Sequence, residues 1–243
     1  TYTYLYPEAD QDAGKFYNDP FASAEAAIKC VDHGFTALKF DPSGQYTVFD
    51  GRMPDLQALD RSAKFFAAIR DAVGNRADLL FGTHGQFTAA GAIRMADRIA
   101  PYEPLWFEEP TPPDMPEEMA KVAAKSSVPI ATGERLCTKY EFARVLQCGA
   151  AAILQPNLGR AGGILEGKKI AAIAETYYAQ IAPHLYCGPV VAAANIQLAA
   201  AIPNFLLLES IQKMDGFHAE LLLQPLCWND GYIIPPKNQA TLL

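Results

Sequence analysis

Three apolar segments of the sequence end in side chains that can transfer protons or bind cations. The first segment runs into Glu108, the second into Glu134 and the third into His184. Carboxylates and imidazoles are the groups that general acids and bases most often use. Oxygen ligands also favour Mg²⁺ or Mn²⁺ over Zn²⁺. The pattern therefore indicates a site that combines acid–base groups with oxygen ligands for a divalent cation.

Further polar side chains stand at or just after the ends of other apolar segments. In a parallel β/α barrel, catalytic groups come from the C-terminal ends of several strands. We therefore expect these residues to share one rim with the two glutamates and the histidine, although a rim of purely structural carboxylates is the alternative. The additional rim residues are Lys39, Asp41, His84, Asn157 and Glu209.

The apolar segments alternate with stretches whose apolar residues have helical spacing. Strands that alternate with helices of 10–15 residues predict βαβ units and a parallel sheet. Eight such strands favour a closed TIM barrel, and the 243 residues match the usual size of one. The fold class is therefore α/β, a (β/α)8-type barrel. The predicted strands lie at 2–6, 35–40, 77–81, 105–107, 128–132, 151–154, 180–183 and 205–208, and the predicted helices at 23–31, 56–73, 88–99, 117–125, 140–147, 164–176 and 190–201.

Two segments fall outside this alternation. The polar segment 43–53 is expected to be a long loop with a functional role, because long loops in compact domains are usually functional or disordered. The last thirty residues, which contain three prolines, are expected to be irregular.

Composition limits the classes of partner. The net charge is −7, and no run of Lys or Arg points to nucleic acid or an anionic membrane. No apolar run approaches the 18 residues that a membrane span needs. Five scattered cysteines without a CxxC pair indicate reduced thiols and a cytoplasmic location. The N-terminus lacks Met and a basic region, so we do not expect these residues to be a signal peptide, and we expect the chain to be part of a longer protein.

Six motifs in order resemble the enolase superfamily, in particular the acid-sugar dehydratases of its mandelate racemase/muconate lactonizing enzyme-like branch. Each motif is weak alone, but together they cover nearly the whole chain. The resemblance implies a modified (β/α)7β barrel at 1–210, a tail at 211–243 that completes a capping domain, and an N-terminal cap that is absent from this sequence. The motifs are ALKFDP at 37–42, THGQ at 83–86, WFEEP at 106–110, ATGER at 131–135, QPNL with AGGI at 155–164, and APH at 182–184.

The resemblance also implies a role for each rim residue. Glu108 and Glu134 would bind Mg²⁺ or Mn²⁺, and His184 would be the general base that removes the proton next to a carboxylate. His84 would be the general acid, and Lys39 would neutralise the substrate carboxylate. The remaining implied roles are a partner of the base for Asn157 and substrate binding for Glu209, Arg135 and Asp41.

Three departures from the family pattern affect these implications. Gly82 stands where the family usually has an aspartate metal ligand, so one ligand is missing, and Asp41, His84 or water could replace it. Asn157 replaces an aspartate; we expect its carbonyl to accept from the ring N–H of the base and to leave a weaker base than a His–Asp pair. Asp41 stands where some branches of the family have a second lysine base, which favours chemistry with His184 as the one base.

The lead hypothesis is a Mg²⁺-dependent dehydratase of a small-molecule sugar acid, acting through an enediolate, in a homo-oligomer. A cycloisomerase of an anhydro-sugar acid or sugar lactone shares the first step and differs in the product. A non-catalytic sugar-acid-binding barrel is the alternative from another class, and Gly82 and Asn157 motivate it.

Overall fold

The computed structural model describes residues 1–42, 50–210, 217–223 and 225–235. Most of the loop predicted at 43–53 lies outside these residues. Among the described helices, none is both long enough and apolar enough to cross a bilayer.

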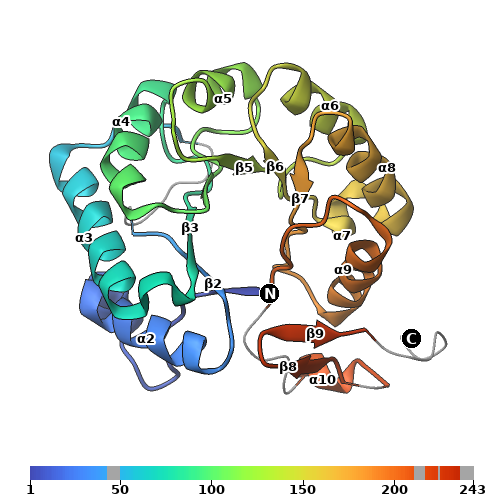
Figure 1. Cartoon of the computed structure of the whole chain (residues 1–243), viewed down its shortest axis with the longest axis horizontal. Helices are drawn as coiled ribbons and strands as arrows, with labels where there is room; N and C mark the ends of the chain where they lie inside the picture. Colours follow the sequence, from blue (N-terminus) through green and yellow to red (C-terminus); the bar gives the residue numbers. More distant parts are fainter. Residues whose placement is uncertain (43–49, 211–216, 224, 236–243) are drawn as a thin grey trace.

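In the described part of the chain, seven parallel strands form one sheet in which each strand pairs with the next along the chain. The strands line a ring and the helices surround it (Figure 1). Consecutive pairing with one helical crossover per step is the arrangement of a β/α barrel. The strands are β1 (Tyr2–Tyr4), β2 (Ala37–Phe40), β3 (Asp78–Gly82), β4 (Trp106–Glu108), β5 (Ile130–Thr132), β6 (Ile153–Leu154) and β7 (Gln180–Ile181).

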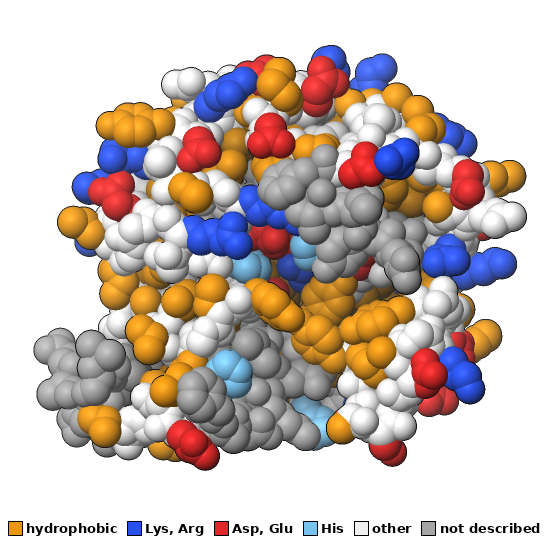
Figure 2. Space-filling view, turned by 180° about the vertical axis from the view of Figure 1, so that it is seen from behind, with side chains coloured by type: hydrophobic (Ala, Val, Ile, Leu, Met, Phe, Trp, Pro, Cys, Tyr) orange, Lys and Arg blue, Asp and Glu red, His pale blue; other side chains and the backbone are white. Residues whose placement is uncertain are grey.

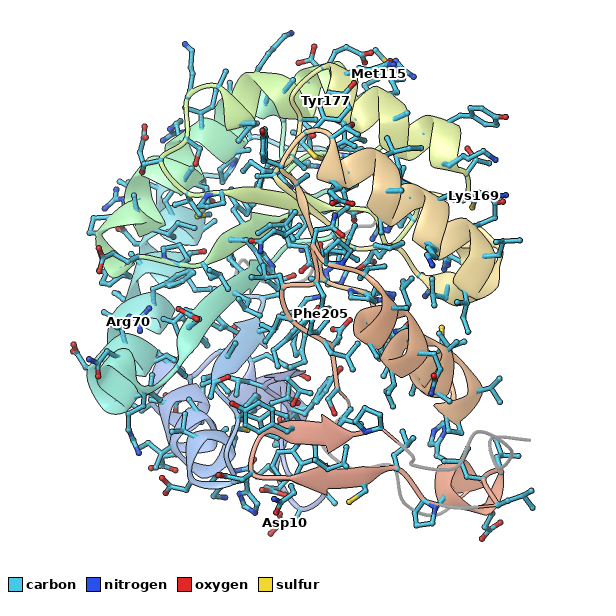
Figure 3. The ribbon with its side chains drawn as sticks, turned by 45° about the vertical axis from the view of Figure 1, so that its right-hand side comes forward. Asp10, Arg70, Met115, Lys169, Tyr177 and Phe205 are labelled. Carbon is cyan, nitrogen blue, oxygen red and sulfur yellow. The ribbon has the colours of Figure 1, made fainter. Side chains whose placement is uncertain are left out.

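The eighth strand predicted at 205–208 forms only in part. Isolated parallel bridges join Ile181 to Phe205 and Tyr2 to Glu209. Backbone N–H groups of Tyr2 and Leu206 also bond across these two junctions, to the carbonyls of Leu208 and Ile181. The segment, which carries the labelled Phe205 in Figure 3, therefore closes the ring between β7 and β1 without regular strand geometry.

Several helices begin where a polar side chain caps the first turn. Asp55 accepts from the N–H of Ala58 at the start of α3, and Thr138 forms a capping box with Glu141 at the start of α6. The seven predicted helices are confirmed, and their observed ends differ only slightly from the prediction. The helices are α1 (Ala13–Phe16), α2 (Pro20–Asp32), α3 (Leu56–Val73), α4 (Ala89–Ile99), α5 (Pro116–Ala123), α6 (Lys139–Gln147), α7 (Leu158–Ala161), α8 (Gly163–Glu175), α9 (Pro189–Ala201) and α10 (Phe217–Glu220), with 3-10 turns at Gly74–Arg76 and Ala100–Tyr102.

Alternation along the strands separates two apolar cores. On β4, Phe107 belongs to the large core between the sheet and the helices, whereas Trp106 belongs to a smaller core inside the ring. Side chains two positions apart on a strand point to the same face. Glu108 therefore faces the inside of the ring directly above Trp106, and this places a carboxylate within the barrel.

The last part of the chain is more regular than predicted. β8 (Cys227–Asn229) and β9 (Tyr232–Ile234) form an antiparallel hairpin, so the prediction of an irregular tail was wrong. The hairpin packs Trp228 against Phe35, with ring centroids 4.9 Å apart, just before β2 begins. The hairpin therefore lies at the amino-terminal end of the strands, opposite the rim where the polar residues gather. The division into a domain at 1–210 and a tail at 211–243 stays a prediction.

Candidate active site

The carboxyl ends of the strands bring the predicted polar residues together. Figure 2 looks at the face opposite to that in Figure 1 and shows histidine, acidic and basic side chains gathered in a hollow at its middle. Salt-bridge contacts connect Lys39, Glu108, Glu134, His184 and Glu209 into one cluster. The cluster joins residues from β2, β4, the segments after β5 and β7, and the closing segment. The predicted common rim is thereby formed.

Glu108 is buried and both of its oxygens accept hydrogen bonds. Lys39 Nζ lies 2.5 Å from Oε1. Trp106 Nε1 and Gln155 Nε2 lie 3.0 and 2.7 Å from Oε2. The side chains of Lys39 and Glu108 are each only 2% exposed. A buried charge of this kind is stable only when it is paired and hydrogen-bonded, and Glu108 meets both conditions.

Lys39 is held between two carboxylates. Besides Glu108, its ammonium lies 3.6 Å from Oε1 of Glu209. Burial acts to lower the pKa of Lys39, but the two carboxylates outweigh it and raise the pKa well above its usual value. Oε2 of Glu209 in turn accepts from the backbone N–H of Leu185, at 2.7 Å. Glu209 therefore supports both the lysine and the loop that carries His184.

The space beside Lys39 exists because residue 82 is a glycine. A Cβ atom on Gly82 would lie 2.7 Å from Cε of Lys39. Real Cβ atoms essentially never approach another heavy atom so closely, so a side chain at position 82 would require the lysine stem to shift from this conformation. The lysine stem thus fills the volume that an aspartate at this strand end would need.

His184 lies between Glu134 and Asn157. Its Nε2 is 3.4 Å from Oε2 of Glu134 and 4.0 Å from Oε2 of Glu209. Burial alone would raise the pKa of Glu134, but the charges of Lys39 and of the neighbouring histidines outweigh it and hold the pKa below its usual value. Glu134 is therefore an ionised carboxylate facing the imidazole.

The contact between Asn157 and His184 has the opposite polarity to the one predicted. Oδ1 of Asn157 accepts from the backbone N–H of Gly159, where it caps α7, so its amide Nδ2 faces Nδ1 of His184 at 2.9 Å. A ring nitrogen that accepts from this amide carries no proton, so the neutral ring has its proton on Nε2. The carbonyl was expected to accept from the ring, but the helix cap already uses it.

His84 and Asp41 form a second histidine–carboxylate pair at the rim. Nδ1 of His84 lies 3.6 Å from Oδ2 of Asp41, which also accepts from Nε2 of Gln86 at 2.8 Å. His84 has a φ angle of +54°, which is unusual for a residue other than glycine. The backbone carbonyl of His84 accepts from Nη1 of Arg135 at 3.0 Å. Strained backbone of this kind concentrates at functional positions.

Glu109 is a buried acid whose carboxylate has few contacts that would offset the cost of burying a charge. Among the described residues, neither of its carboxylate oxygens has a hydrogen-bond partner, and Arg135 Nε lies 3.5 Å from Oε2. Burial and the nearby charge of Glu134 raise the pKa of Glu109 well above its usual value. Glu109 also has a positive φ, +42°. The pKa values of Glu109 and Glu134 are thus shifted in opposite directions, as is common for groups in an acid–base site.

The cluster does not fit a divalent cation at Glu108 in this arrangement. Lys39 already occupies the oxygen that a metal would take, and position 82 supplies no ligand. Within the described ranges, no group of three His, Cys, Asp or Glu residues could hold a metal ion. The predicted ligand role of Glu108 and Glu134 stays a prediction.

Two contributors to the site were not predicted as such. Trp106 is a buried residue of the small core inside the ring, and its indole N–H also donates to Glu108. Its position two residues before Glu108 on a strand was a signal for this contact, because both side chains point to one face. Gln155 was part of a motif without a role, and only the pairing of β5 with β6 brings its amide to Glu108.

Comparisons with known proteins agree with this architecture. Residues 22–239 match the family model described as enolase C-terminal domain-like. D-xylonate dehydratase of Haloferax volcanii is 34% identical over 90% of this chain and 54% of that protein. D-galactonate dehydratase of Variovorax paradoxus is 42% identical over 80% of this chain and 50% of that protein.

The structural comparison covers nearly the whole chain. The crystal structure of a mandelate racemase/muconate lactonizing enzyme from Sulfitobacter sp. is 59% identical, with a TM-score of 0.92 over 97% of this chain and 59% of that one. The chain spans about half the length of the two dehydratases. The comparison with these dehydratases therefore concerns about half of each of them.

Proposed function

The chain belongs to the enolase C-terminal domain-like family, and from this premise we propose that it is the catalytic barrel of a sugar-acid dehydratase. The reaction removes the proton from the carbon next to the substrate carboxylate and expels the hydroxyl group on the following carbon as water. The resulting enol then becomes a 2-keto-3-deoxy acid. Relatives named D-xylonate and D-galactonate dehydratase support this class of substrate.

The observation that carries the proposal is the placement of His184 beside a charged floor, formed by the buried residues Lys39, Glu108 and Glu209, with His84 near enough for its charge to act on Glu134. His184 and Glu134, each with a side chain 12% exposed, are the more accessible members of the cluster, whereas Lys39 and Glu108 are 2% exposed. A bound sugar acid would therefore meet His184 from the open side. His184 would take the proton at Nε2, and the electron pair left on carbon would form the enediolate.

The departure of the hydroxyl group requires a proton donor. His84 supplies this proton, which leaves with the hydroxyl oxygen as water, and the carbon–oxygen bonding pair goes with it. Asp41, 3.6 Å from Nδ1, stabilises the ring when it carries a proton. Arg135 fixes the carbonyl of His84, so its position supports orientation of the acid as well as the predicted contact with substrate.

Proton removal by His184 requires a change at Asn157. Nε2 can accept only when the ring proton is on Nδ1, and Nδ1–H must then meet an acceptor. The Asn157 amide would have to turn its carbonyl toward the ring and give up the bond from Gly159. Leaving that N–H without a partner costs about 1–3 kcal/mol, so His184 is a weaker base than it would be beside an aspartate.

The test is a screen of sugar acids with two readouts. Keto-acid formation with loss of one water measures dehydration, and incorporation of solvent deuterium next to the carboxylate measures proton removal. His184→Asn should abolish both, while His33→Asn, which replaces an exposed histidine at the end of α2, should abolish neither.

Each alternative gives a different result in this screen. Deuterium incorporation into a rearranged product that has not lost water would indicate the cycloisomerase. Binding without deuterium incorporation would indicate a non-catalytic sugar-acid-binding barrel and would contradict the proposal.

Assembly and location belong to the same proposal. We expect a homo-oligomer in the cytoplasm, with a small-molecule sugar acid and neither nucleic acid nor a membrane as partner. Size-exclusion chromatography with light scattering, at several protein concentrations, tests the oligomer.

A further inference from the structure

The carboxylate of Glu108 already has a positive partner inside the barrel. The ammonium of Lys39 lies 2.5 Å from Oε1, and two neutral N–H donors hold Oε2. All three donors belong to side chains in the buried floor of the site. A cation that bound Glu108 would have to displace one of these donors from a carboxylate that is only 2% exposed.

The lysine takes this position because of its neighbour on β3. β2 and β3 pair in parallel register, with Phe40 opposite Phe81, which brings the stem of Lys39 against Gly82. The 2.7 Å separation between an added Cβ and Cε of Lys39 leaves no room for both an aspartate and this lysine conformation. The absence of a carboxylate at Gly82 and the position of the Lys39 ammonium therefore have the same cause, because the lysine fills the volume that the carboxylate would need.

The charge of Lys39 already balances carboxylates that a divalent cation would need as ligands. Oxygen ligands of Mg²⁺ usually include one or two carboxylates, and the remaining positions are filled by water or substrate. Here Lys39 lies within 3.6 Å of both Glu108 and Glu209, so one fixed charge already serves two carboxylates. Glu134 keeps its own contact with His184. The surplus negative charge attracts cations to the rim in general, but no group of three ligands among the described residues fixes one there.

We propose that the ammonium of Lys39 takes the place of a divalent cation on Glu108, so that this barrel works without a bound metal. The catalytic part of this inference rests on the proposed function. The part that concerns what binds Glu108 does not. Lys39 then neutralises Glu108 and offsets part of the charge of Glu209 beneath the substrate, so the negative enediolate forms over less negative charge than the carboxylates alone would present.

The first experiment measures metal binding on the full chain, with Mn²⁺ as the probe and its free-ion resonance signal as the readout. Glu108→Gln is compared with Glu118→Gln, which changes an exposed glutamate paired with Lys121. We expect weak binding that does not saturate and is equal in all three proteins. Saturable Mn²⁺ binding that Glu108→Gln removes and Glu118→Gln retains would overturn the inference.

A second variant tests whether Lys39 and Gly82 are the reason that Glu108 binds no metal. Replacing Gly82 by aspartate and Lys39 by alanine together restores a ligand and removes the ammonium, so the double variant should gain saturable Mn²⁺ binding. Adding Glu108→Gln should remove it again. If a folded double variant gains no binding, Lys39 is not what keeps the metal out, and the inference fails. If the double variant does not fold, the comparison of the unmodified chain with Glu108→Gln decides.

The third readout separates this inference from the proposed function. Deuterium incorporation into the sugar acid should persist after the protein is treated with a chelator. Loss of incorporation that Mg²⁺ restores would refute metal independence while supporting the function. Absence of incorporation with and without Mg²⁺ would contradict the function, and the Mn²⁺ titration would still decide how Glu108 is occupied.

Discussion

Replacing Lys39 by methionine should destabilise the protein strongly, because it leaves Glu108 as a buried charge without its ammonium. The side chains of both residues are 2% exposed, so solvent cannot substitute for the lost partner. Removing one member of a buried ion pair typically costs about 3–5 kcal/mol. The bonds from Trp106 and Gln155 persist, which places the expected loss near the lower end, about 3 kcal/mol.

Thermal and chemical unfolding measure this loss. In a chain of this size, 1 kcal/mol shifts the melting temperature by about 2–4 °C, so the variant should melt about 6–12 °C lower. Lys121→Met removes a lysine whose side chain is 61% exposed and should leave the melting temperature unchanged.

The double variant Lys39→Met with Glu108→Gln distinguishes a true pair from two separate defects. The new amide at position 108 can still accept from Trp106 and Gln155 and can donate toward Glu209, so most of the lost stability should return. A coupling free energy of about 2 kcal/mol between the two positions is expected, within the range for residues in one network. If the two single losses simply add, the pair is not a unit and the reasoning about Glu108 is wrong.

Three further predictions address neighbouring residues. Asn157→Asp should speed deuterium incorporation next to the substrate carboxylate about tenfold or more. An aspartate can accept from Nδ1–H of His184, which avoids the cost of turning the amide. A slower reaction would contradict the base role of the histidine. Burial and the neighbouring carboxylate raise the pKa of Glu109 well above 4.5, so the folded protein retains a proton that the unfolded chain releases. The stability from this proton is present below about pH 4.5 and is lost as the pH rises through the folded-state pKa, so Glu109→Gln should become more stable than the unmodified protein as the pH rises; parallel melting curves at all pH values would refute this. Trp106→Phe removes one donor to Glu108 and should cost about 1–3 kcal/mol in denaturant unfolding, whereas an unchanged midpoint would show that the indole N–H contributes little.

The sequence predicted the barrel well because its signals are local. Helix α3 has its predicted bounds, since its apolar spacing and the glycine after it can be read within one segment. The rim was predictable for a related reason: parallel strands end at one face, so Glu108, Glu134 and His184 had to meet there.

What the sequence did not reveal depends on contacts between distant segments. The polarity of Asn157 follows from the N–H of Gly159, which competes for its only carbonyl oxygen. The position of Lys39 follows from the empty volume at Gly82 on the next strand. The hairpin β8–β9 was missed because its strands are short and it finds its packing partner, Phe35, far away along the chain.

The closing segment of the ring has a consequence for the order in which this protein is made. β1 leaves the ribosome long before the closing segment does, yet the backbone hydrogen bonds that close the ring join Tyr2 to Leu208 and Ser210. Contacts between such distant residues form late, because a long loop must first be closed. Glu209 is also the second carboxylate on Lys39 and holds the loop before α9. The charged floor is thus incomplete on a nascent chain, and we expect α-proton exchange to appear only after the ring has closed.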